Sequence, residues 1–453
     1  MATVSQDGHQ SNGRGPVETP DNPLHRLTPE QIEEIGREFD ELHEQVKADL
    51  GDRDARYIRS IIALQRRLAL LGRAELFASR WRIPWVVGAS TLGLAKILEN
   101  MEIGHNVLHG QWDWMNDPVI NSRAWDWDTA STAEAWRHSH NFIHHTYTNI
   151  LGKDRDLGYE IMRIDPQQPW HPVYLAQPIY NIFLALLFEW GVAVHDLDLE
   201  AIRKGDKSME EVRKDLKGIA GKARTQIVKD YIAWPLISGI VMTAIDAALI
   251  SYKARSESGP TQQVKRTVGK VRRRPGGGAV DVVKQLVARR SFREPFVRTL
   301  QANVLANLLR NVWSYAIIFC GHFPDQTYTF TQEETDNETR GGWYVRQLSG
   351  AANIDGGPVF HVLSGNLGYQ VEHHLYPDMP STRYGEIAPK VREICVRYGL
   401  PYNSGPFHQQ LGMVQRTIAR LAFPGGEERP KPGAYDGPMV RGKGEQQAPK
   451  AGD

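Results

Sequence analysis

The distribution of histidine is the feature that most constrains this chain. Ten of its 16 histidines fall in four short stretches, at 105–109, 138–145, 322 and 361–374. All four stretches adjoin segments of apolar residues that are long enough to form helices. The second stretch carries four histidines in eight residues, which is rare on a solvated helix surface. A purely surface role therefore does not account for the clustering.

Most of these histidines share one of two spacings. His105 and His109 are four positions apart, which on a helix puts both imidazoles on one face, about 6 Å apart. The second stretch repeats that spacing and then doubles the final histidine, and the fourth ends in a doubled histidine. With the isolated residue at 322, the candidate ligands are His105, His109, His140, His144, His145, His322, His373 and His374.

The number of imidazoles indicates more than one metal ion. Neutral imidazole binds iron, zinc and copper, and eight imidazoles exceed the four-coordinate shell of one structural zinc. Taken alone, His322 is more typical of a histidine at a helix end, where its cation suits the helix dipole. Glu-x-x-His pairs do not repeat along the chain, which disfavours a ferritin-like diiron site. A pair of metals is the economical interpretation.

Composition excludes several classes of protein. Lys and Arg number 54 against 53 Asp and Glu, and a formal charge of +1 argues against a protein that coats nucleic acid. The only cysteines, Cys320 and Cys395, are too few for a disulfide scaffold and form no Cys-x-x-Cys motif for a zinc ribbon or iron–sulfur centre. Since 41% of the residues are hydrophobic, a sizeable core can be buried.

Hydropathy leaves the relation to a membrane open. The mean hydropathy of −0.45 is typical of a soluble protein. Four stretches nevertheless approach the roughly 20 residues that span a bilayer. Each is interrupted or flanked by charge, and a charge at mid-membrane costs about 3 kcal/mol on insertion scales. These stretches are Ile83–Leu98, Pro172–Val194, Tyr231–Tyr252 and Asn303–Gly321. On hydropathy alone, buried helices of a soluble bundle and membrane spans are equally compatible with the sequence.

Local composition predicts five regions. Residues 253–294 hold twelve basic and three acidic residues, which fits either a solvated loop or a contact with an anionic lipid or nucleic acid. The predicted regions are a disordered tail at 1–26, helices with the first two histidine stretches at 27–252, a basic low-order insertion at 253–296, a last membrane helix with the final stretch at 297–423, and a disordered tail at 424–453.

The histidine motifs and their flanks resemble a known family. His105-x-x-x-His109, His140-x-x-x-His144-His145 and Gln370-x-x-His373-His374 resemble the three histidine boxes of membrane fatty acid desaturases. The stretches 96–112, 144–154 and 368–377 look like the corresponding parts of bacterial acyl-CoA desaturases. The resemblance covers roughly residues 60–252 and 297–420.

This resemblance implies a fold and an activity. The expected fold is an all-α membrane bundle of about four spans in the cell membrane, with a cytosolic cap that carries the metal site. The expected activity is desaturation of a fatty acyl chain, as acyl-CoA or acyl-lipid, by two non-haem irons and O₂. Because no ferredoxin, haem or flavin motif occurs in the chain, electrons are expected from an external NAD(P)H-dependent reductase, with or without a ferredoxin. A hydroxylase on the same scaffold and a non-enzymatic metal-binding membrane protein are the alternatives.

The chain departs from the family pattern at three positions. Gln370 stands where many members have a ligand histidine, so it is expected to bind weakly, through water, or not at all. His138 is an extra histidine that is expected beside the metals or at the surface. His361 precedes Gln370 by nine residues and is expected beside the metals. Polar residues expected to orient the imidazoles are Glu102, Asn141, Asp154, Asp156, Asn366 and Glu372. Tryptophans expected to wall an acyl tunnel, anchor at the interface or pack in the core are Trp112, Trp114, Trp125, Trp127 and Trp136.

Overall fold

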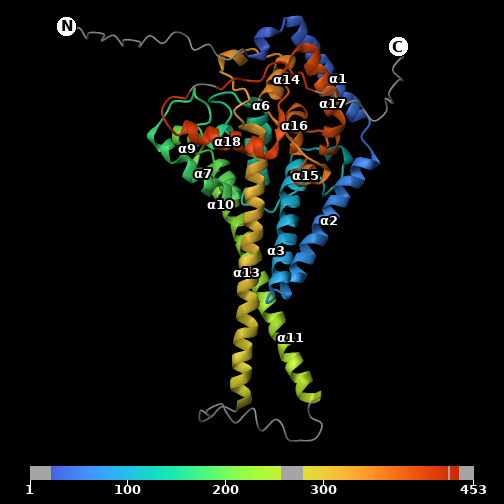
Figure 1. Cartoon of the computed structure of the whole chain (residues 1–453), viewed down its shortest axis with the longest axis vertical. Helices are drawn as coiled ribbons and strands as arrows, with labels where there is room; N and C mark the ends of the chain where they lie inside the picture. The colour runs from blue at the N-terminus through green and yellow to red at the C-terminus, as the bar shows by residue number, and fades with distance from the viewer. Residues whose placement is uncertain (1–21, 257–278, 427–428, 438–453) are drawn as a thin grey trace, which may run out of the picture.

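The computed structural model describes residues 22–256, 279–426 and 429–437, and these form a helical head on a long helical stem (Figure 1). The stem contains α2 (Asp52–Phe77), α3 (Arg82–Ile97), α11 (Trp234–Ser256) and α13 (Ala279–His322), with α13 packed against both α3 and α11. The prediction of an all-α fold is confirmed for the described residues, whose one sheet is a parallel pair of three-residue strands.

The head is assembled from shorter elements. The head elements that precede α11 in the chain are α1 (Pro29–Ala48), α4 (Asn106–Leu108), α5 (Ala133–Trp136), α6 (His145–Tyr147), α7 (Gln177–Leu186), α8 (Phe188–His195), α9 (Leu199–Lys204) and α10 (Met209–Gln226). The head elements that follow α13 are α14 (Arg340–Ser349), β1 (Asn353–Asp355), α15 (Pro358–Leu363), α16 (Gln370–Leu375), α17 (Tyr384–Tyr398), β2 (Ser404–Pro406) and α18 (Phe407–Leu421). Short 3-10 turns cover Pro23–Arg26, Asp113–Met115, Leu157–Glu160, Pro172–Ala176, Glu333–Thr335, Leu367–Tyr369 and Ser381–Arg383.

Local sequence explains why α1 begins where it does. The Thr28 side chain accepts a hydrogen bond from the Gln31 amide while the Gln31 side chain accepts one from the Thr28 amide, and Pro29 occupies the first turn. Phe39 on the buried face of α1 then packs with Tyr344 of α14, their ring centroids 5.1 Å apart. This contact joins α1 to the core cluster that also contains residues of α16, which carries the last histidine box.

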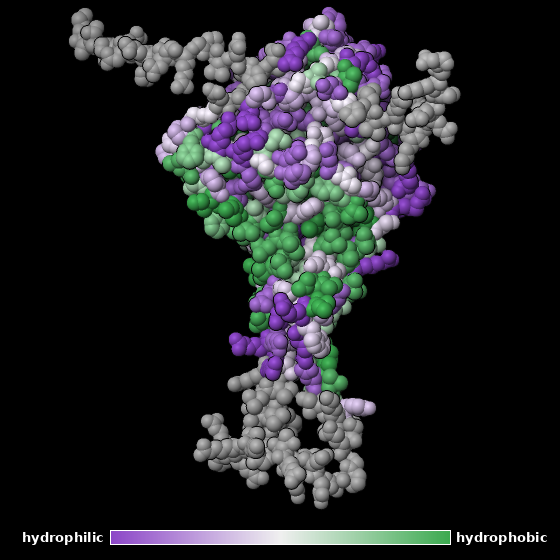
Figure 2. All heavy atoms as spheres, viewed as in Figure 1, coloured by the Kyte–Doolittle hydropathy of each residue, from purple (hydrophilic) through white to green (hydrophobic). Residues whose placement is uncertain are grey.

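Two helices meet the length and composition required to cross a membrane among the described residues, Met209–Leu249 and Arg290–His322. Large apolar side chains are exposed along the first, including Ile240 and Leu249, which are 59% and 54% exposed. Figure 2 shows hydrophobic side chains around the upper stem and the underside of the head, and hydrophilic ones on the top of the head and the lower stem. An exposed apolar belt of this kind suggests membrane association.

Helix replaces much of the low-order insertion expected at 253–296. α11 continues through residue 256, and α13 begins at Ala279 and passes through Pro295. The breaker at Pro275–Gly278 is followed by sixteen residues without Pro or Gly, so nothing in the local sequence prevents a helix from starting there. Residues 257–278 lie outside the described residues.

The expected disordered tails also fall partly outside the described residues. Where the chain is described, Pro23–Arg26 forms a turn whose first amide is capped by the Asn22 side chain. Near the other end, the Lys431 ammonium donates to the Thr327 carbonyl and the Tyr328 hydroxyl donates to the Pro432 carbonyl, at 2.6 and 3.0 Å. The described parts of both segments are therefore ordered against the head.

Candidate metal centre

Two π-helical turns lie at the first two histidine boxes. These turns are Leu98–His105, which prolongs α3, and Arg137–His144, which precedes α6. A π turn takes one more residue than an α turn and is frequent at functional sites. Gly104 permits the first one, because a Cβ there would lie 2.8 Å from the Glu99 carbonyl oxygen and 3.0 Å from Trp127. The histidines of both boxes therefore lie on or directly beside helix, and each helix contains a π turn at the box.

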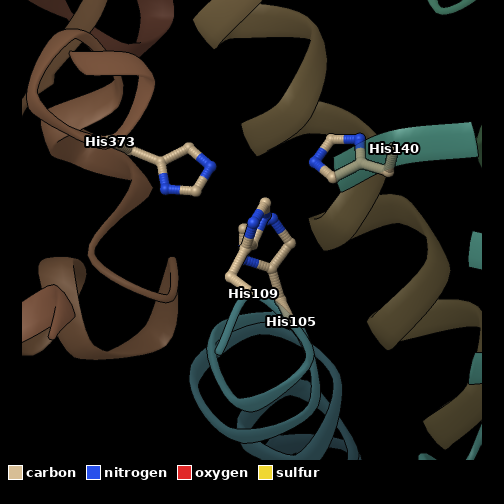
Figure 3. A group of neighbouring side chains, drawn as sticks. All are labelled: His105, His109, His140 and His373. Carbon is tan, nitrogen blue, oxygen red and sulfur yellow. The ribbon is translucent and has the colours of Figure 1, made fainter. Parts of the chain in front are cut away.

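One group of histidines draws on all three boxes. His105 ends the first π turn, His109 directly follows α4, His140 lies in the second π turn, and His373 lies in α16. One ring nitrogen from each lies within 4.8 Å of the others. Figure 3 shows the four imidazoles pointing toward one another. We call this set the first histidine group.

A second group lies beside the first. It consists of His144, His322 at the end of α13 and His374 of α16, again with one nitrogen from each within 4.8 Å of the others. The ring centroid of His322 is 4.7 Å from that of His144 and 4.8 Å from that of His374. We call this set the second histidine group.

His145 lies between the two groups. Its ring centroid is 4.8 Å from that of His109 in the first group and 4.7 Å from that of His374 in the second. Neither of its ring nitrogens has a hydrogen-bond partner among the described residues. The tertiary structure thus brings together all eight histidines that the sequence nominated.

The donor set fits metal ions. An unpaired polar atom in the interior is costly, and most such atoms find a partner. Here the buried Nε2 atoms that lack a partner among the described residues belong to His109, His140, His144, His145, His373 and His374. Burial lowers the pKa of His105 to about 3 and the pKa of His109, His145, His373 and His374 well below the usual range, with the neighbouring imidazoles adding to the effect. Neutral imidazole with a free Nε2 is the form that binds a metal.

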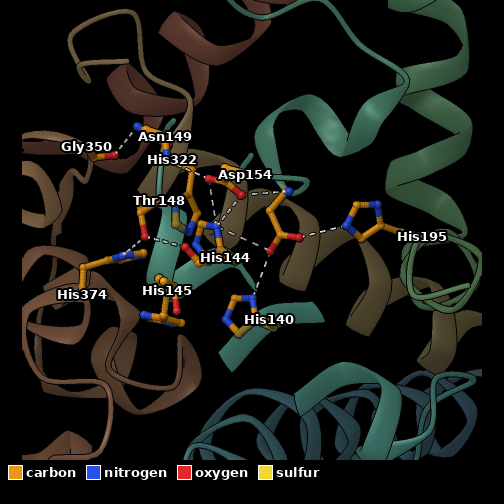
Figure 4. Close-up of polar contacts among 12 residues, drawn as sticks. His140, His144, His145, Thr148, Asn149, Asp154, His195, His322, Gly350 and His374 are labelled. Carbon is orange, nitrogen blue, oxygen red and sulfur yellow. Dashed lines mark hydrogen bonds and ion pairs between the residues drawn. The ribbon is translucent and has the colours of Figure 1, made fainter. Parts of the chain in front are cut away.

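Carboxylates orient the imidazoles of the second box. His144 Nδ1 lies 3.0 Å from a carboxylate oxygen of Asp154 (Figure 4), and His140 Nδ1 lies 3.0 Å from Asp156. The other oxygen of Asp156 is 2.9 Å from His195 Nε2. An N–H donated to a carboxylate places the proton on Nδ1 and leaves Nε2 free. The sequence had nominated both aspartates for this role, but not His195.

Neutral groups orient the imidazoles of the third box. The Tyr384 hydroxyl donates to the Tyr376 carbonyl and therefore accepts from His373 Nδ1, 3.1 Å away. His374 Nδ1 lies 2.9 Å from the Gln347 side-chain oxygen. Both contacts again place the proton on Nδ1. Neither Tyr384 nor Gln347 was nominated from the sequence, because nothing in the local sequence distinguishes them from ordinary core residues.

The remaining nominated polar residues bond to one another, to other buried side chains or to the backbone. Asn366 donates to Glu102 at 3.1 Å, and the Tyr57 hydroxyl donates to the same carboxyl at 2.8 Å. Burial raises the pKa of Glu102 to about 8. Glu372 accepts from Asn353 and Tyr402, and Asn141 donates to the Leu108 carbonyl. These residues brace the segments that carry the boxes.

The three residues that depart from the family pattern lie in different surroundings. Gln370 is buried, and its amide nitrogen lies 3.0 Å from His322 Nε2, at the edge of the second group. His361 instead stacks on Tyr369, with ring centroids 4.3 Å apart. His138 is exposed and stacks on Phe142.

A largely apolar cavity, whose lining also includes the carboxylates of Asp156, Glu189 and Asp196, borders the first group. Trp136 stacks on His140 with ring centroids 4.6 Å apart and lines this cavity together with Trp127. Its other apolar walls include Met101, Phe188, Val192 and Ile318. Trp112, Trp114 and Trp125 pack in a core cluster around Ile58 and Ile103 instead. Two of the five tryptophans nominated from the sequence thus lie at the cavity.

Comparison with known proteins agrees with this site. The fatty acid desaturase family model matches residues 81–250 and 271–406. The NADPH-dependent stearoyl-CoA 9-desaturase of Mycobacterium tuberculosis is 42% identical over 415 residues, which cover 92% of this chain and 85% of that protein. The sn-1 linoleoyl-lipid 6-desaturase of a Synechocystis species is 22% identical over 71% of this chain and 76% of its own length. No solved structure matches. With its three histidine boxes gathered around one buried centre, the chain belongs to the fatty acid desaturase family.

Proposed function

We propose that the protein introduces a double bond into a long-chain acyl-CoA at a centre of two iron ions. The observation that carries this proposal is the pair of histidine groups, whose unpartnered Nε2 atoms converge beside an apolar cavity. A relative 42% identical over 92% of the chain is named a stearoyl-CoA 9-desaturase, which supports a saturated C18 thioester as substrate and reaction near mid-chain.

The proposed ligand set follows the two groups. His105, His109, His140 and His373 would hold one ion. The second ion would be held by His144, His322 and His374, with Gln370 beside the open side of that set. His145 is available to either ion because its ring lies between them. Histidine-rich ligation suits iron, and Asp154 and Asp156 would keep the rings of His144 and His140 in the ligating tautomer.

The reaction sets what the chain has to provide. Removing two hydrogens from adjacent CH₂ groups with one O₂ consumes two electrons and two protons and yields two waters. Bound iron and O₂ would supply the oxidising power that an unactivated C–H bond requires and that no side chain has. The chain's own residues hold the alkyl chain against the first histidine group, and the Trp127 and Trp136 rings keep water from that wall of the cavity.

Electrons would come from outside the chain. The sequence carries no ferredoxin, haem or flavin motif. A relative whose name includes "NADPH-dependent" supports an NADPH-consuming reductase as the source. Purified protein with acyl-CoA and O₂ is therefore expected to remain inactive until such a reductase, with or without a ferredoxin, is added.

The proposed topology has α2, α3, α11 and α13 as four spans in the cell membrane and the head in the cytoplasm. The hairpin of α11 and α13 extends away from the histidine groups (Figure 1), which supports placing the basic segment 253–296 on the opposite side of the membrane. That placement runs against the usual enrichment of Lys and Arg on the cytoplasmic side. Protease protection of sealed vesicles, with a tag inserted between residues 257 and 278, tests it directly.

The function is tested by product analysis. A host that expresses the protein is expected to accumulate a monounsaturated C18 acyl chain, and a His144→Ala variant is expected to abolish it. Mass spectrometry of the product also separates desaturation from its closest rival, because a hydroxylase would add oxygen to the chain instead of removing two hydrogens. Metal analysis that finds zinc and no iron in active protein would contradict the diiron assignment.

A further inference from the structure

Helix α8 separates two spaces. Its eight residues are mostly apolar, and the two exceptions, Glu189 and His195, are buried. Phe188 and Val192 on one side line the cavity beside His105 and His140. Trp190 and Val194, two positions further along, line a groove on the outer surface of the head. A spacing of two residues is about 200° around a helix, so the cavity and the groove lie on opposite faces of α8.

Two side chains belong to both spaces. Tyr159 and His195 line the inner cavity and also the outer groove. The Tyr159 ring lies 5.2 Å from the His195 ring and stacks parallel to Phe319, with centroids 5.6 Å apart. At this point the partition between the cavity and the surface is a single side chain thick.

The backbone that holds Tyr159 is strained. Gly158, Tyr159 and Glu160 have φ values of 66°, 53° and 58°, which is the left-handed region. For residues with a Cβ this conformation costs roughly 1–2 kcal/mol each, and such strain concentrates at functional sites. α8 also has a break before it, because the chain departs from helical geometry at Leu187 between α7 and α8. The surrounding structure therefore holds Tyr159 in a backbone conformation that a residue with a Cβ disfavours.

The outer groove is an apolar surface. Phe183, Leu187, Val194 and Leu199 line it and are each at least half exposed, at 58%, 50%, 50% and 56%. It continues onto the apolar helical segment Pro172–Leu186. Figure 2 shows hydrophobic side chains gathered on the flank of the head where Figure 1 places α7 and α9. An exposed apolar surface of this extent fits hydrocarbon and not water.

We propose that this groove is a lateral portal through which a single fatty acyl chain passes between the bilayer and the cavity at the first histidine group. Displacement of the Tyr159 side chain opens the portal. The inference rests on the proposed function for the identity of the chain. The groove supplies a route on which the alkyl chain stays out of water, whereas the top of the head is hydrophilic (Figure 2). Tyr159 and His195 form walls of both spaces, so an acyl chain in the groove would be separated from the cavity by these side chains alone.

A matched pair of cysteine variants tests the portal. Phe183 lines the groove and its neighbour Ile182 does not, yet both are exposed to a similar extent, 58% and 59%. Both native cysteines are buried, so a bulky maleimide would react at the introduced residue. Labelling Phe183→Cys is expected to lower kcat/KM for stearoyl-CoA about tenfold relative to the same variant before labelling, and labelling Ile182→Cys to change it less than twofold. Equal effects at the two sites, or none at either, would overturn the portal.

A second measurement does not depend on turnover. Stearoyl-CoA that carries a diazirine on its terminal carbon is expected to crosslink to Leu187 or Trp190, and excess unlabelled stearoyl-CoA is expected to suppress this labelling. Crosslinks confined to the inner cavity would overturn the portal even in an active enzyme. If the wild-type protein forms no unsaturated product while the groove is still labelled, the proposed function fails and the binding groove stands.

Discussion

The first and second histidine groups are built from similar segments but have different surroundings. The first offers four imidazoles and borders an apolar cavity lined by Trp127, Trp136 and Phe188. The second offers three imidazoles, and His322 borders a polar pocket that includes Asp325 and Arg429. The two adjacent groups offer the same kind of ligand, but they differ in the number of imidazoles and in the polarity of the neighbouring cavity. Under the proposed function, this difference favours substrate contact at the first group and gives the second ion fewer imidazole ligands.

The largest effect is expected from removing one imidazole from each group. His322→Ala leaves two imidazoles in the second group, whereas His105→Ala leaves three in the first. If wild-type protein holds about two irons per chain, His322→Ala is expected to fall to about one and His105→Ala to stay closer to two, while both lose nearly all activity. Elemental analysis measures this, with the exposed His138→Ala as control. Equal iron loss in the two variants would remove the distinction between the groups.

A smaller effect is expected from the two aspartates. Asp154 orients His144 of the second group, and Asp156 orients His140 of the first. Asp154→Asn and Asp156→Asn are each expected to lower activity about 10- to 100-fold, the usual loss when a residue that orients a ligand is changed. Mössbauer spectra of ⁵⁷Fe-loaded protein should show a different iron perturbed in each variant. The same iron perturbed in both would mean that the aspartates do not distinguish the groups.

Gln370 tests the lower number of imidazoles in the second group. Gln370→His would add a fourth imidazole next to His322, and we expect it to bind iron as tightly as wild type or more so, measured by resistance to a chelator. Gln370→Ala is expected to keep its iron and to lose activity only in part. A Cβ on Gly321 would lie 2.8 Å from the Gln370 side chain, so Gly321→Ala should reproduce the Gln370→Ala behaviour. Loss of iron in Gln370→His would mean that the glutamine does not face the metal.

The smallest effect is expected from Glu102, which braces the helix of the first group. Because burial raises the pKa of its carboxyl to about 8, the folded protein keeps a proton there at pH values where the unfolded chain has released it. This group therefore lowers stability progressively as pH rises from about 4.5 to about 8. Glu102→Gln is expected to flatten the fall in Tm over that window, and the exposed Glu210→Gln is not. Parallel Tm profiles for Glu102→Gln and wild type would contradict this.

Hydropathy could not decide between membrane spans and buried helices, and the reason lies in packing. A sequence window reports how apolar a helix is, but not which of its side chains the rest of the chain covers. α3 packs on α2 and α13 along one face, but its Ile83 remains exposed, as do Ile240 and Leu249 of α11. The helix that begins directly after the breaker at Pro275–Gly278 was also not predicted. The breaker had suggested that the irregular stretch continued beyond it.

The sequence by itself determined which histidines meet, and it also nominated Asp154 and Asp156. Seven of the eight histidines were nominated from short spacings and doubled residues within single segments, where local geometry is preserved on folding. His322 was nominated as an isolated histidine after an apolar segment, and the two aspartates as polar residues close to the second box. Only the tertiary structure decided how the histidines divide into two groups, because the second group takes its members from positions 144, 322 and 374. It also decided the partners Gln347 and Tyr384 and the partition at Tyr159. Those contacts join segments distant along the chain, and packing, which no local pattern encodes, brings them together.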